Sequence, residues 1–192
     1  MLVFKSRNEP KLSKSLKHLK DEELMILVSN GHLDNLTILF DRYHLRIFNF
    51  FNKMIHNKDV SEDLTQDVFY KVMKYRTSYK NGNFTSWIYT VARNIFSSYY
   101  QKQKKQSAST LDEKFIKSDE KLDSDTNEDE INHLQRALLK LNHTDRELII
   151  MNRYQEIKYA EMAEIIGSSE GAIKVRVHRA LKKLKEIYFQ NI

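Results

Sequence analysis

The sequence predicts an all-α protein made of two small helical domains. Only four glycines and one proline interrupt its 192 residues, so the chain has few of the residues that tight hairpin turns require. Helix-favouring residues such as Lys, Leu, Ile and Glu are plentiful. In several long segments apolar residues recur at intervals of three and four, which is typical of the buried face of a helix.

The uneven distribution of charge indicates the domain boundaries. The formal net charge is +6, yet residues 107–133 carry nine acids and three lysines, a balance of −6 that leaves +12 for the rest. This acidic stretch has few apolar residues, so we expect a flexible acidic linker. The predicted organisation is a basic tail over residues 1–20, a first helical domain over 21–106, the linker over 107–130 and a second helical domain over 131–192.

Four apolar patterns predict the helices of the first domain. We expect Asp21 to cap the first helix, and the others to span residues 35–55, 57–75 and 85–105. Helical spacing turns one set of residues of the second helix inward: Leu36, Leu39, Phe40, Tyr43, Ile47, Phe50 and Phe51. For Phe84 and Trp87 the spacing favours the core over base stacking by about two to one.

The second domain contains the parts of a helix-turn-helix. Residues 134–154 predict two helices, the second capped by Asn142 or Thr144. A short apolar helix follows, and Gly167 suits the left-handed backbone that ends it. Ser169 can then cap the last helix, and a short helix, a turn and a second capped helix make up the motif.

The last helix presents a face without acids. Residues 171–185 contain six Lys or Arg and no acidic residue, while apolar residues from Ile173 to Ile187 share the opposite, packed face. Such a face can lie in the major groove, where phosphates would repel carboxylates; the alternative is a solvated basic surface. We expect Lys182, Lys183 and Lys185 to contact phosphates and to position the helix. The candidate DNA contacts are Ser169, Gly171, Lys174, Val175, Arg176, His178, Arg179 and Lys182.

The motifs DVSEDLTQDVFYKV, FTSWIYTVARN and YAEMAEIIGSSEGAIKVRVHRALKKL follow one another in this order. With them the chain resembles sigma factors of bacterial RNA polymerase, of the compact extracytoplasmic-function (ECF) type, over residues 21–106 and 131–189. The resemblance implies a region 2 domain that recognises the minus-10 element and a region 4 domain that recognises the minus-35 element. The implied partners are the β′ coiled coil and the β flap of core polymerase, promoter DNA and an anti-sigma factor.

The resemblance also implies roles for individual residues. The helix with SEDLTQDVF would dock on the β′ coiled coil through Asp63, Gln66, Asp67 and Phe69. The residues that would hold an extruded minus-10 base are Tyr79, Lys80, Asn81 and Asn83. Those that would line the path of the single strand are Arg93, Asn94, Lys102, Lys104 and Lys105. Ser98 and Gln101 stand where family members often have Asp and Arg, so no promoter contact is assigned to them.

Composition and motifs exclude several other classes. Without cysteine the chain can form no disulfide or thiolate metal site, and it carries none of the common catalytic or metal-binding motifs. We therefore expect no enzymatic activity, cofactor, metal or small-molecule substrate. The absence of a long apolar run predicts a cytoplasmic protein that does not insert into a membrane. Two alternatives stay open: an autonomous helix-turn-helix repressor or activator, and an interaction module whose basic helix binds an acidic protein.

Overall fold

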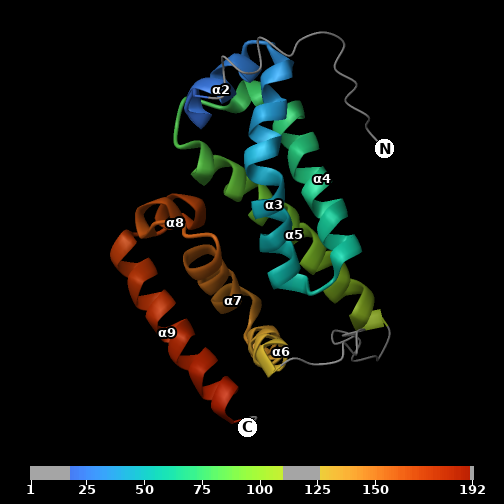
Figure 1. Cartoon of the computed structure of the whole chain (residues 1–192), viewed down its shortest axis with the longest axis vertical. Helices are drawn as coiled ribbons and strands as arrows, with labels where there is room; N and C mark the ends of the chain where they lie inside the picture. Colours follow the sequence, from blue (N-terminus) through green and yellow to red (C-terminus); the bar gives the residue numbers. More distant parts are fainter. Residues whose placement is uncertain (1–17, 110–125, 191–192) are drawn as a thin grey trace.

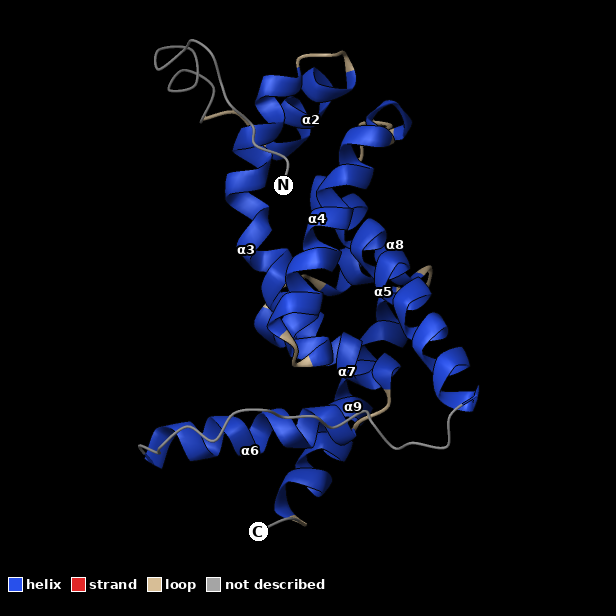
Figure 2. Cartoon of the chain, turned by 90° about the vertical axis from the view of Figure 1, so that its right-hand side faces the viewer, coloured by secondary structure: helices blue, strands red, loops and turns tan. Residues whose placement is uncertain are grey.

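The computed structural model describes residues 18–109 and 126–190, and every regular element in these two ranges is helical (Figure 1; Figure 2). The predicted all-α fold is therefore confirmed. Most of the predicted basic tail and the middle of the predicted linker lie outside the described residues. Within the described ranges, no helix combines the length and the apolar character needed to cross a membrane.

The first domain is a helical bundle in which α3 lies beside α4, and α4 beside α5 (Figure 1). Its centre is mostly apolar, with Leu39, Phe50, Val68 and Ile88 completely buried. In chain order it comprises α2 (Asp21–Ser29), a 3-10 turn (Leu33–Asn35), α3 (Leu36–Ile55), α4 (Lys58–Lys74), a second 3-10 turn (Arg76–Ser78) and α5 (Phe84–Ser109).

Asp21 does not cap α2, contrary to the expectation from the sequence. It is the first residue of the helix, and the backbone N–H of the preceding Lys20 donates to the Glu23 carboxylate at 2.7 Å. The Asp21 carboxylate instead accepts hydrogen bonds from Arg42 and, at 2.6 Å, from the Tyr43 hydroxyl. Asp21 thus joins α2 to α3, because two donors on the neighbouring helix compete successfully for its carboxylate.

The helices on both sides of the predicted linker are longer than expected. Helix α5 continues to Ser109, and α6 spans Thr126–Lys140, so both ends of the predicted 107–130 linker are helical. Acidic residues suggested a solvated tether, but they are also favoured in the first turn of a helix, where the backbone carries a partial positive charge. Residues 110–125 are outside the described part of the chain.

The second domain wraps three helices around α9. It comprises α6, α7 (His143–Ile149), a π-helical turn (Ile150–Tyr154), α8 (Tyr159–Ile166) and α9 (Glu170–Phe189). Asn142 caps α7 as predicted, with its side-chain oxygen accepting from the Asp145 N–H at 2.8 Å. A small apolar core lies between α6, α7 and α9 and consists of Ala137, Leu138, Leu141, Ile149, Ala180 and Leu184.

The two domains also pack against each other. A single apolar cluster runs from Phe50 and Ile88 in the first domain to Leu148, Met151 and Ile157 in the second. Helix α8 lies beside α5, and the π-helical turn lies on α3. The sequence suggested two separate bodies, whereas the structure joins them through a common core.

Arg146 of α7 connects the ends of two helices at this junction. Its guanidinium donates to the carbonyl oxygens of Leu138, Leu139 and Leu141 at the end of α6, at 2.9, 2.5 and 2.9 Å. It also donates to the Met54 carbonyl at the end of α3 at 2.5 Å. Burial lowers the pKa of Arg146 to about 10, so the group stays charged at neutral pH. A cation here offsets the partial negative charge of the carbonyl oxygens that each helix end leaves without a hydrogen-bond partner.

Replacing Arg146 with methionine should lower the free energy of unfolding by about 2–4 kcal/mol, because several partly buried carbonyl oxygens lose their donor. Urea denaturation followed by circular dichroism measures this. The matched control is Arg136→Met, an exposed arginine of α6, for which we expect a change within about 0.5 kcal/mol. Equal destabilisation by both substitutions would contradict the capping role of Arg146.

Candidate nucleic-acid and partner interfaces

The predicted helix-turn-helix is present in α8 and α9. Gly167 ends α8 with φ 71°, a left-handed conformation in which a glycine carries no side-chain penalty. Ser169 caps α9, its hydroxyl accepting from the Ala172 N–H at 3.2 Å. These two residues fix the angle between the helices, and both predictions are confirmed.

Helix α9 is divided into a packed and an exposed face as its sequence predicts. Ile173, Val177, Ala180 and Leu184 are buried, and Arg176 is half-buried at the border. The helix packs on α6, α7 and α8, at the side of the molecule away from α3 and α4 (Figure 1). Exposed candidate DNA contacts are Ser169, Gly171, Lys174, Val175, His178, Arg179 and Lys182.

Two of the lysines on α9 already have acidic partners. Lys174 forms an ion pair with Glu170 at 2.7 Å, and this hydrogen bond raises its pKa. Lys183 pairs with Asp145 of α7 at 2.6 Å. Although burial acts in the opposite direction, the hydrogen bonds from Lys183 and Asn142 hold the pKa of Asp145 below its usual value. Lys183 therefore connects α9 to α7, and both Lys182 and Lys183 are exposed.

The predicted polymerase-binding residues of α4 lie on two different sides of the helix. Asp63, Gln66 and Asp67 are exposed, as expected, but Phe69 is buried. Its ring packs edge-on against Phe40 of α3, with 4.7 Å between ring centroids.

Phe40 was predicted to face the core and is instead 42% exposed. The apolar stripe of α3 is wider than the surface that α4 covers, which leaves Phe40 at its border, stacked on His44 with 4.8 Å between the ring centroids. Phe40 and His44 thus form an aromatic patch beside the acidic surface of α4.

The loop before α5 is folded around a buried tyrosine. Tyr79 is only 7% exposed, packs against Trp87 and Phe84, and donates its hydroxyl proton to the Gly82 carbonyl. Burial, together with the charges of Glu22 and Asp21, raises its pKa to about 12. In this conformation Tyr79 supports the loop and offers no free ring for a base, while Lys80, Asn81 and Asn83 are exposed at its surface. Phe84 is completely buried, in agreement with the core prediction from its spacing.

The candidates on α5 fall into two groups. Asn94, Lys102, Lys104 and Lys105 are exposed to solvent. Arg93 instead faces the second domain, where its Nε donates to Glu147 of α7 at 3.2 Å. Asn83, just before α5, also reaches the second domain and donates to Glu161 of α8 at 3.0 Å. Ser98 and Gln101, the departures from the family pattern, are exposed on the solvent side of α5.

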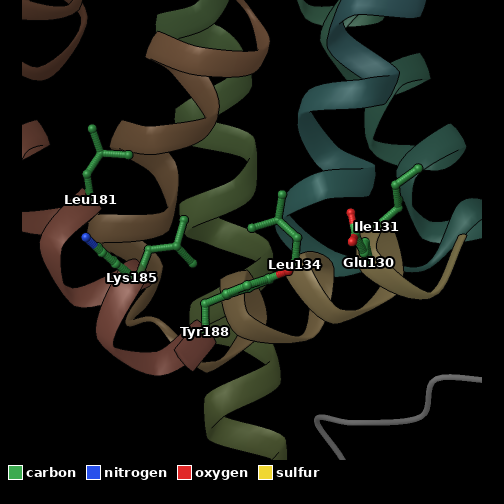
Figure 3. A pocket seen from close by; sticks show the side chains of 7 residues that line it. Glu130, Ile131, Leu134, Leu181, Lys185 and Tyr188 are labelled. Carbon is green, nitrogen blue, oxygen red and sulfur yellow. The ribbon is translucent and has the colours of Figure 1, made fainter. Parts of the chain in front are cut away.

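One surface was not anticipated from the sequence, an apolar pocket between the middle of α6 and the end of α9 (Figure 3). Tyr188 extends from α9 toward Leu134 of α6, and the exposed Ile131 lies beside them. The signal in the sequence was the apolar spacing of α9 beyond the helix-turn-helix, which continues to Ile187 and Tyr188. The pocket is lined by Glu130, Ile131, Leu134, Leu181, Leu184, Lys185 and Tyr188. Among the described residues, no cluster of three His, Asp or Glu side chains could hold a metal ion.

Comparison with known proteins identifies the family. The model for Sigma-70 region 2 matches residues 39–106, and that for Sigma-70, region 4 matches residues 131–184. The ECF RNA polymerase sigma factor EcfG of Rhodopseudomonas palustris is 30% identical over 134 residues, which cover 69% of this chain and 74% of that relative. The chain belongs to the ECF RNA polymerase sigma factors. The RNA polymerase sigma factor YlaC of Bacillus subtilis is 28% identical and matches 81% of this chain and 92% of its own length.

Two solved structures resemble this ECF sigma factor as well. The sigma factor RpoE of Bartonella quintana, in complex with the anti-sigma factor NepR, is 28% identical with a TM-score of 0.66, covering 77% of this chain and 92% of that one. CnrH, in complex with the cytosolic domain of CnrY, shares the fold with a TM-score of 0.70 at 17% identity, covering 90% and 99% of the two chains. The family membership predicted from the sequence is confirmed, and the two alternative functions receive no support.

The turn of the helix-turn-helix allows a test with two glycines. Gly167→Ala should lower the free energy of unfolding by about 1 kcal/mol, because alanine is strained at a positive φ although the space around the position is open. Gly171→Ala, inside α9 and equally open, should raise it by about 0.5–1 kcal/mol, since alanine favours helix. Thermal or urea denaturation measures both changes, and a shared sign would contradict the assigned turn geometry.

Proposed function

We propose that this ECF sigma factor binds core polymerase through the exposed face of α4, captures the minus-10 strand with α5 and the loop before it, and places α9 in the major groove of the minus-35 element. The observation that carries the proposal is the separation of exposed charge. Asp63 and Asp67 mark an acidic surface on α4, whereas the exposed face of α9 from Gly171 to Lys182 holds only cations and neutral residues. One chain thus offers one surface suited to a basic protein and another suited to DNA.

On α9, chemistry divides the proposed roles. Lys174 and Arg179 can donate hydrogen bonds to base edges or to the backbone, and Val175, 49% exposed, can contact a thymine methyl group. Lys182 positions the helix through phosphates without reading sequence. Lys174 must leave Glu170 to do so, a small cost because the ion pair is exposed.

On α4, the partner is a basic helical surface of the polymerase, for which the β′ coiled coil is the candidate. Exposed carboxylates of Asp63 and Asp67 can pair with arginines, and Gln66 between them can hydrogen-bond. Phe40 supplies the exposed aromatic ring at the edge of this surface, while Phe69 supports it from below.

Within the first domain, the strand-binding surface consists of the loop before α5 and the cations along that helix. Lys80 and Asn81 are exposed in the loop, and Asn94 is exposed farther along α5. Such a surface suits a single strand, because the cations can follow its phosphates and the polar groups can hold an unpaired base. Lys102, Lys104 and Lys105 extend this basic path toward the end of α5.

The apolar pocket between α6 and α9 is the candidate site for an apolar helix of the β flap. Ile131 is 60% exposed and Leu134 half-buried, so this surface is available to a partner. An anti-sigma factor is proposed as a further partner by analogy with RpoE, which was solved in complex with the anti-sigma factor NepR. We assign the chain no catalytic activity or cofactor, and place it in the cytoplasm, where core polymerase is found.

The polymerase contact is tested by charge reversal. Asp67→Lys should weaken association with core polymerase by about tenfold or more, because a lysine would face basic residues of the partner. Asp41→Lys, an equally exposed position on α3, serves as the control and should bind as the unmodified chain does. Fluorescence anisotropy of the labelled chain titrated with core enzyme measures both affinities; unchanged binding by the Asp67 variant would remove α4 from the interface.

Promoter selection is tested by in vitro transcription with core polymerase on randomised templates, with sequencing of the start sites. Lys174→Ala and Arg179→Ala should each weaken initiation at selected promoters by about 1–3 kcal/mol and relax the sequence preference. Lys182→Ala should weaken initiation at all promoters alike, because phosphates carry no sequence information. Equal losses at unrelated promoters for all three variants would refute base reading by α9.

A further inference from the structure

We propose that the free chain is self-occluded: α7 and α8 of region 4 cover one side of the strand-binding surface of region 2, and two of their carboxylates occupy groups that the minus-10 strand would contact. The inference rests on the proposed role of Asn83 and Arg93 in strand binding. It adds an intramolecular competitor for that surface, formed by Glu147 and Glu161.

The first contact joins the middle of α5 to α7. Arg93 donates from Nε to the Glu147 carboxylate at 3.2 Å, and only 7% of the Glu147 side chain is exposed. Burial raises the pKa of Glu147, and the charge of Arg93 partly offsets this. A buried carboxylate requires a cationic partner, so Glu147 holds Arg93 in place while the domains are packed.

The second contact lies at the start of α5. Asn83 donates from Nδ2 to Glu161 at 3.0 Å, while its side-chain oxygen accepts from the Ser86 N–H at 2.7 Å. The other carboxylate oxygen of Glu161 accepts from the Lys158 N–H at 3.1 Å and caps α8. The Asn83 side-chain oxygen and one of its two amide N–H donors therefore have partners, which leaves a single N–H of this group for a base or a phosphate.

Further contacts cover the same side of α5 between and beyond these two positions. The Tyr89 hydroxyl donates to the Gln155 side chain at 2.8 Å in a buried site. Tyr100 packs against His143 of α7, with 4.5 Å between the ring centroids. From Asn83 to Tyr100 one side of the helix is thus covered by region 4, whereas Asn94, on another side, is exposed.

Competition follows from the chemistry of the two carboxylates. A phosphate and Glu147 compete for the Arg93 guanidinium, whose Nε is already bonded to Glu147, so the packed arrangement weakens DNA contact at Arg93 although 34% of the side chain is exposed. Binding energy from core polymerase or DNA that favours the open arrangement would shift the equilibrium toward it. The polar contacts at the edge of the domain junction are suited to such a change because ion pairs and single hydrogen bonds exchange readily for water, whereas the apolar core that the domains share opposes opening.

The test uses the full chain, in which two introduced cysteines are the only labelling sites because the native sequence has none. Spin labels at Thr77→Cys and Lys158→Cys, two exposed positions on either side of the Asn83–Glu161 contact, report the distance between the domains. The test variant is Glu147→Gln with Glu161→Gln. The matched control is Glu164→Gln with Glu186→Gln, which removes two exposed carboxylates of region 4. Circular dichroism verifies that all variants fold.

We expect a single narrow distance distribution for the unmodified chain and the control pair, and a broad one for the test variant. Binding of a labelled single-stranded oligonucleotide of mixed sequence should become about fivefold tighter, or more, for the test variant relative to the control pair. A broad distribution in the unmodified chain would overturn the proposal. Equal distances and equal oligonucleotide binding in the test and control variants would do so too.

Titration of the spin-labelled chain with core polymerase separates this inference from the proposed function. If core enzyme binds and the distance distribution becomes broader or shifts to longer distances, the proposed function and the self-occlusion both stand. If core enzyme does not bind, the assigned sigma surfaces fail, while the distances measured without polymerase still decide whether the free chain is closed. If core enzyme binds and the narrow distribution persists, closure does not compete with assembly and the inference falls.

Discussion

The arrangement of the two domains depends on Arg146. Helices α3 and α6 both end at the junction, and each leaves backbone carbonyl oxygens without a partner inside its own helix. One guanidinium, with donors fixed in a plane, satisfies three carbonyls of α6 and the Met54 carbonyl of α3. Gln135 adds a bond from α6 to the Lys53 carbonyl at 3.1 Å. The end of α3 is therefore completed by residues of the other domain.

This junction determines what each helix of the second domain can do. With Arg146 fixed, its neighbours His143 and Glu147 on α7 meet Tyr100 and Arg93 of α5. Burial and the surrounding cations lower the pKa of His143, which favours its neutral ring at this contact. Helix α9 packs on the far side of α7 (Figure 1), and the residues of its basic face are exposed. The inner helices thus face region 2, and the outer helix leaves its basic face free for the proposed DNA contact.

The sequence predicts the elements and the local chemistry of this protein well, because both are determined by nearby residues. The left-handed Gly167, the Ser169 cap and the exposed face of α9 all follow from spacing and residue type. Predictions that needed tertiary partners were less accurate: Asp21 bonds across to α3, and Phe40 lies beyond the edge of the packed face. The junction itself could not be predicted, since Arg146 and Glu147 look like ordinary charges of an amphipathic helix until α3 and α5 are placed beside them.

The junction combines a polar edge with an apolar centre, and the two parts have opposite effects on domain separation. Exposed polar pairs such as Asn83 with Glu161 contribute little net free energy, because water replaces each partner when the contact opens. Leu148, Met151 and Ile157 belong to the common core, so separating the domains exposes apolar surface at a cost of about 25 cal/mol per Å². Water cannot offset that cost, whereas a large partner with its own apolar surface can. Such a partner therefore favours separation, and in the proposed closed arrangement the polar contacts at the edge determine which residues of region 2 are withheld before it binds.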